Sequence, residues 1–102
     1  MQFDVLTLFP EMFNILNESI IGRAKEKGLI NVNLINIRDF SKNKHKKVDD
    51  TPYGGGAGMV LMAQPYVDAY ESIKKIKNSI TVMLSPQGEP LTDNLVNDLA
   101  GY

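Results

Sequence analysis

The sequence predicts an α/β fold in which helices flank a parallel sheet. Three β-rich runs, Phe3–Phe9, Val32–Ile37 and Ile80–Leu84, alternate with segments of helical pattern. The first run is apolar on both faces, as expected of a strand inside a sheet that helices cover. Strands that alternate with helices in this way are typical of parallel α/β sheets.

The first connection is predicted to be helical. A short helical turn is expected near Glu11–Leu16, and a helix over about Ser19–Lys27. Asn17 is a candidate cap for that helix. Gly28 occupies the usual position just past its end, where a positive φ is common.

The later elements are less regular. Residues 38–59 have little periodic pattern, and helix resumes around Pro65, which suits a first helical turn. An apolar stripe at a spacing of three is expected on that helix, formed by Val67, Tyr70, Ile73 and Ile76. After the third run, a short helix beginning near Thr92 is indicated by Leu91, Leu95 and Leu99.

Composition excludes several classes of protein. The chain has 102 residues, 43% of them apolar, and a net charge of −1 from 11 basic and 12 acidic residues. The absence of cysteine excludes disulfides, thiolate metal sites and cysteine nucleophiles. There is neither an apolar run of the ~20 residues that span a bilayer nor a signal-peptide pattern, so we expect a cytoplasmic protein.

A basic run lies between residues 38 and 47. Its members are Arg38, Lys42, Lys44, His45, Lys46 and Lys47. Such a patch could contact phosphates, or it could be a solvated loop that keeps the protein soluble. His45 is the single histidine, and the sequence pattern offers no set of residues to complete a metal site around it, so no metal is expected.

A glycine-rich stretch, residues 49–59, follows the basic run. Its sequence DDTPYGGGAGM has Met59 where a dinucleotide fingerprint needs glycine, and it lacks the lysine of a P-loop. A hairpin or a flexible linker remains an alternative. The two adjacent carboxylates and the tyrosine favour a shaped functional loop.

A further candidate is the turn Leu84-Ser85-Pro86-Gln87-Gly88, which follows the third β-rich run. Ligands in open α/β sheets bind outside the carboxyl ends of the strands. Exposed backbone groups there could hydrogen-bond a flat heterocycle, although many strand-to-helix connections look alike.

Together these segments resemble the bacterial tRNA (guanine-N1)-methyltransferases, which methylate guanosine 37 beside the anticodon. The motifs that carry the resemblance are LTLFPEMF at 6–13, GRA at 22–24, IRDF at 37–40, KHK at 44–46, VDD at 48–50, PYGGGAGM at 52–59 and LSPQG at 84–88. The order and spacing of VDD-x-PYGGG-x-GM are highly specific.

The resemblance implies a SPOUT-class α/β fold with a trefoil knot, a homodimer, and S-adenosylmethionine as cofactor. It places the cofactor on Leu84, Ser85, Pro86, Gln87 and Gly88. It places tRNA and the target guanine near Asp49, Gly58, His45, Lys44 and Lys46. The family's catalytic base is an aspartate further downstream, so no catalytic residue is assigned in this stretch.

The last helix is followed by residues 100–102, where an α/β chain would turn into another strand. We therefore expect residues 1–102 to be the amino-terminal part of the methyltransferase domain, truncated before the knot is completed and without the C-terminal tRNA-binding domain. The expected function is methylation of N1 of guanosine 37, with the isolated stretch inactive. The alternative is a non-catalytic tRNA- or RNA-binding module.

Overall fold

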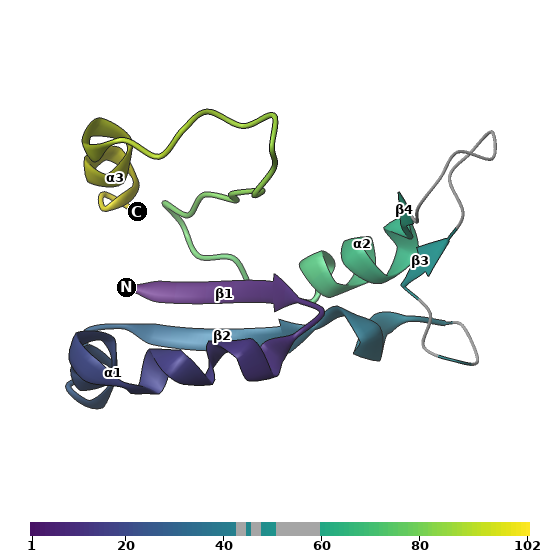
Figure 1. Ribbon diagram of the computed structural model, residues 1–102, viewed down its shortest axis with the longest axis horizontal. Helices are drawn as coiled ribbons and strands as arrows, with labels where there is room; N and C mark the ends of the chain where they lie inside the picture. Colours follow the sequence, from purple (N-terminus) through teal and green to yellow (C-terminus); the bar gives the residue numbers. More distant parts are fainter. Residues whose placement is uncertain (43–44, 46–47, 51–59) are drawn as a thin grey trace.

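A parallel pair of strands organises the structure (Figure 1). The computed structural model describes residues 1–42, 45, 48–50 and 60–102. Strands β1 (Gln2–Thr7) and β2 (Asn31–Asn36) pair along their whole length, from Gln2 opposite Asn31 to Thr7 opposite Asn36. The prediction of a parallel sheet is confirmed.

The crossover between the two strands is helical, as predicted. It consists of the 3₁₀ helix η1 (Pro10–Asn17) and helix α1 (Ser19–Glu26). The Thr7 hydroxyl accepts a hydrogen bond from the Phe9 amide (3.0 Å). Pro10 then begins η1, because its fixed φ suits a first helical turn.

The capping of α1 differs from the prediction at one end. Glu18 occupies the N-cap position, without a side-chain capping bond, so Asn17 as the cap was wrong. The Asn17 carbonyl oxygen Oδ1 instead accepts from Lys25 Nζ (2.6 Å). At the other end Gly28 has a φ of +73°, as predicted for the residue after a helix.

Gly22 allows η1 and α1 to lie close together. A Cβ at this position would be 2.2 Å from the backbone oxygen of Asn17, and Gly22 is the buried residue of α1. The junction is tight, since Ser19 adopts a φ of +58° there. The glycine of the GRA motif is therefore a packing requirement of the crossover.

The most deeply buried side chains lie beyond the carboxyl ends of β1 and β2. The elements there are η2 (Ile37–Phe40), the antiparallel pair β3 (Asp49–Asp50) and β4 (Val60–Leu61), and helix α2 (Ala63–Glu71). Ile37, Val48, Pro65 and Ala69 are buried. Helix α2 packs on η2, so the core joins segments from both sides of the basic run.

The apolar stripe predicted on α2 was wrong. The helix ends at Glu71, where the Ser72 hydroxyl donates to the Ala69 carbonyl (2.6 Å), so Ile73 and Ile76 lie beyond it. Val67 is 50% exposed, because the face that packs on η2 is the one with Pro65 and Ala69. Spacing alone did not distinguish the two faces.

The third strand was also wrong. Residues 80–84 are described and form no strand, with Leu84 93% exposed. Tyr70 and Thr81 share a hydrogen bond between their hydroxyls (2.9 Å), which ties this stretch to α2. A β-rich run becomes a strand only when another strand supplies its hydrogen bonds, and here none does among the described residues.

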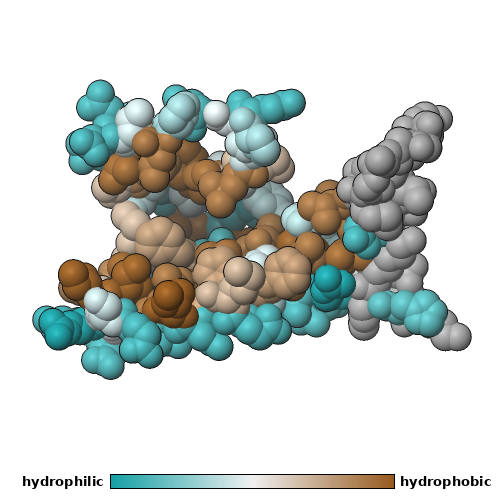
Figure 2. All heavy atoms as spheres, viewed as in Figure 1, coloured by the Kyte–Doolittle hydropathy of each residue, from teal (hydrophilic) through white to brown (hydrophobic). Residues whose placement is uncertain are grey.

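Helix α3 (Asp93–Leu99) begins after Thr92, as predicted. It lies on the side of β1 away from α1 (Figure 1). Figure 2 shows apolar atoms gathered between α3 and the strand layer, with polar atoms along the outer edges of this view. Within the described ranges, no helix is long and apolar enough to cross a membrane.

Replacing Gly22 by alanine should destabilise the fold, because the new Cβ would overlap the Asn17 carbonyl. We expect the free energy of unfolding to fall by about 1–3 kcal/mol, the usual cost of overpacking, measured by urea denaturation. Gly101→Ala is the matched control, since its Cβ would meet its nearest neighbour at 3.4 Å, an ordinary contact. Equal stability of the two variants would contradict this account of Gly22.

Candidate functional site

The basic run starts directly from the buried core. Ile37 follows β2 and is fully buried, which fixes the position of η2. The Asn36 side chain caps η2 by accepting from the Arg38 amide (3.0 Å). Arg38 and Lys42 then extend from this fixed turn as exposed cations.

The end of the basic run is also fixed. Val48 is 1% exposed, and its carbonyl accepts from the Met62 amide (2.6 Å). Asp49 follows in β3, opposite Leu61, and is half-buried. His45 is exposed. Three other residues predicted for the tRNA side lie outside the described residues, namely Lys44, Lys46 and Gly58.

A hydrogen-bonded side chain that sequence reasoning missed connects η2 to α2. The Gln64 amide nitrogen donates to the Phe40 carbonyl (2.5 Å) and to Asp68 Oδ2 (2.6 Å). Its oxygen accepts from the Lys42 amide (3.1 Å). The signal in the sequence was weak, a polar residue in the first turn of a helix. Its partners are up to 24 residues away in sequence, so local patterns could not identify them.

The predicted cofactor turn is exposed. The Gly88 amide donates to the Ser85 carbonyl (3.0 Å), and the Gln87 amide donates to the Ser85 hydroxyl (3.1 Å). These two amides are therefore engaged within the turn. The remaining backbone groups of residues 84–88 are on an exposed stretch that leads towards α3.

The turn offers at most one wall of a cofactor site. All residues from 80 to 94 are exposed, whereas a small-molecule site buries most of its ligand. The structure also keeps this turn apart from β3 and β4, so it does not bring the two predicted groups of site residues together (Figure 1). The described residues alone do not form an enclosed S-adenosylmethionine pocket.

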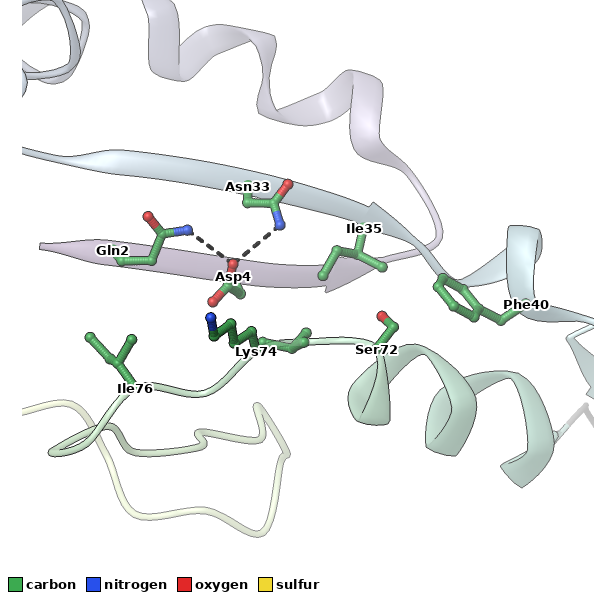
Figure 3. A pocket seen from close by; sticks show the side chains of 9 residues that line it. Gln2, Asp4, Asn33, Ile35, Phe40, Ser72, Lys74 and Ile76 are labelled. Atoms are coloured by element: carbon green, nitrogen blue, oxygen red, sulfur yellow. Dashed lines mark hydrogen bonds between the residues drawn. The ribbon is translucent and has the colours of Figure 1, made fainter.

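A hollow of about 460 Å³, lined by both polar and apolar side chains, lies on one face of the β1–β2 pair (Figure 3). Asp4 Oδ1 accepts from Gln2 Nε2 (3.0 Å) and from Asn33 Nδ2 (3.2 Å). Lys74 extends towards the same carboxylate in Figure 3. None of the residues that line this hollow was predicted as a site residue. The signal in the sequence was the alternation of asparagines in β2, which places Asn31 and Asn33 on one face.

Comparison with known proteins identifies the family. The family model described as tRNA (Guanine-1)-methyltransferase TrmD matches residues 1–102. The chain belongs to this family. The resemblance inferred from the sequence motifs is thus confirmed.

Several tRNA (guanine-N(1)-)-methyltransferases are similar to this member of the family. That of Clostridium botulinum (strain Langeland) is 56% identical over 98% of this chain and 42% of the relative. That of Ruminiclostridium cellulolyticum is 54% identical over 98% of this chain and 44% of the relative. The chain thus spans less than half the length of these curated relatives.

A solved structure confirms the fold class. The crystal structure of tRNA (m1G37) methyltransferase from Aquifex aeolicus matches with a TM-score of 0.81 and 35% identity. The match covers 100% of this chain and 47% of that one. The α/β, SPOUT-like fold class predicted from the sequence is confirmed.

The cap of α3, which follows the predicted cofactor turn in the chain, can be tested. The Thr92 hydroxyl accepts from the Leu95 amide (3.2 Å). Thr92→Ala should speed hydrogen exchange at the Leu95 amide and destabilise α3 by about 1 kcal/mol, the typical value of such a cap. Thr92→Ser keeps the hydroxyl and should exchange like the wild type. Equal exchange in the alanine variant would show that the cap contributes nothing.

Proposed function

We propose that this chain is part of an enzyme that uses S-adenosylmethionine to methylate N1 of guanosine 37 in tRNA. The match of the family model to residues 1–102 carries the proposal. Since the chain spans 42% of the Clostridium botulinum relative, the activity is proposed for the whole protein to which this fold belongs. We also propose that the protein works as a homodimer.

We assign the basic run and the residues after it to the tRNA side. Lys42 and His45 are exposed, and Lys42 directly follows the fixed turn η2, which suits contacts with phosphates. Asp49 lies in β3, after the basic run in the chain, and is proposed to lie near the target guanine. Lys44, Lys46 and Gly58 remain predictions for the same side.

We assign the turn Leu84–Gly88 to the cofactor side. When bound, S-adenosylmethionine supplies the methyl group. The exposed Leu84 side chain and the free backbone groups of the turn would hold one side of it. Guanine N1 carries a proton that a general base must remove. We assign no base within residues 1–102, so the isolated chain should not turn over.

A chimera tests the proposed function. This chain replaces the matching 100 residues of the Clostridium botulinum relative, and methyl transfer to unmodified tRNA is measured. We expect methylation at position 37 at a rate within about tenfold of the relative. Misplacing the reacting groups at the junction of the chimera would lower the rate by up to about a hundredfold. The same tRNA with adenosine at position 37 is the control and should not be methylated.

Two results would contradict the proposal. One is an inactive chimera that is folded and still binds tRNA, because this is what a non-catalytic RNA-binding module would give. The other is methylation of the control tRNA. The isolated chain should give no turnover in the same assay, and turnover above background would show that a base does lie within it.

Asp49 can be tested in the same chimera. Asp49→Ala should lower kcat/KM by about tenfold or more, because a hydrogen bond to a charged group contributes ~1.5–3 kcal/mol. Asp98→Ala is the matched control, since Asp98 is an exposed carboxylate of α3. If both variants keep full kcat/KM, Asp49 does not contact the substrate.

A further inference from the structure

We propose that Gln64 is a positioning residue for tRNA binding, which holds Lys42 at the start of the basic run where it can contact a phosphate. This inference rests on the proposed function, since it assigns a role on the tRNA side. Gln64 itself lies on α2 and does not need to touch the RNA.

The side-chain amide of Gln64 has all its groups engaged. Both N–H groups donate, one to the Phe40 carbonyl and one to Asp68, and the oxygen accepts from the Lys42 amide. An amide is the side-chain group that can donate twice and accept at once. The three bonds therefore fix its orientation, and with it the backbone on both sides of Ser41.

The bond to the Lys42 amide is exposed, whereas the other two bonds lie in more sheltered surroundings. Gln64 is half-buried, and its contacts with Phe40 and Asp68 are partly shielded from water. Hydrogen bonds in such surroundings are stronger than on an open surface. Without them the Phe40 carbonyl would lose a partner at the edge of the buried core.

Two residues at the entry to α2, Met62 and Gln64, hold the chain on either side of the later part of the basic run. Gln64 bonds the Lys42 amide, and Met62 bonds the Val48 carbonyl. Closing a segment at both ends removes conformational freedom before a ligand binds. A pre-organised cation then loses less entropy when it meets a phosphate, which favours affinity.

The competing explanation is that Gln64 only stabilises the packing of α2 on η2. Both explanations predict some loss of stability when the amide is removed. They differ in the salt dependence of tRNA binding, because only the loss of a phosphate contact changes the slope of log affinity against log salt.

The test compares two Gln→Met variants of the chimera with the Clostridium botulinum relative. Gln64→Met keeps the length and neutrality of the side chain but removes the three bonds. Gln2→Met is the matched control, since Gln2 also bonds two side chains, Asp4 and Asn31, at the far end of β1. The dissociation constant for unmodified tRNA is measured from 50 to 300 mM salt, with hydrogen exchange at the Lys42 amide.

For Gln64→Met we expect the dissociation constant to rise about five- to tenfold at 0.1 M salt and the salt slope to fall by about one. Exchange at the Lys42 amide should become faster. Gln2→Met should leave all three readouts unchanged. If Gln64→Met keeps the wild-type slope, or if the control loses as much, the positioning role is overturned.

Failure of the proposed function would look different, because the chimera with wild-type Gln64 would then not methylate guanosine 37 of tRNA. If the Gln64→Met variant is too unstable to measure, hydrogen exchange in the wild-type protein still tests the inference. In the wild type, tRNA must slow exchange at the Lys42 amide more than at the Asn31 amide of β2. If bound tRNA slows exchange at the Lys42 amide no more than at the Asn31 amide, the positioning role is overturned.

Discussion

The packing of α2 on η2, around Ile37, Val48 and Ala69, is the interaction on which the rest of this structure depends. Parallel strands end at the same edge of a sheet, so the chain leaving β2 must be fixed just beyond that edge. Ile37 is the first residue there and is fully buried. Helix α2, which packs on η2, follows the basic and glycine-rich segments in the chain.

This arrangement explains why a near-neutral protein can present a local positive surface. Gln64 hydrogen-bonds the backbone of Lys42, and Val48, directly after the basic run, is buried. The side chains of Lys42 and His45 are exposed. The predicted cofactor turn is separate and lies on an exposed stretch. The described residues thus hold the proposed RNA side in place and provide only one wall of the proposed cofactor side.

Local signals in the sequence predicted much of the fold. Helix α1, the positive φ of Gly28 and the start of α3 near Thr92 each depend on neighbouring residues. Residues 80–84 could not be predicted in the same way, because a strand needs a partner that propensity does not supply. The Gln64 bonds join residues distant in sequence, so they too were missed. The family motifs identified the candidate site residues, whose roles stay predictions.

The central claim is that tRNA meets the segment held between η2 and β4, and not the other exposed surfaces. Photo-crosslinking of tRNA to the chain, with the adducts mapped by mass spectrometry, tests it most directly. We expect adducts within residues 38–59. Adducts concentrated on α1, or on the turn at residues 84–88, would contradict it.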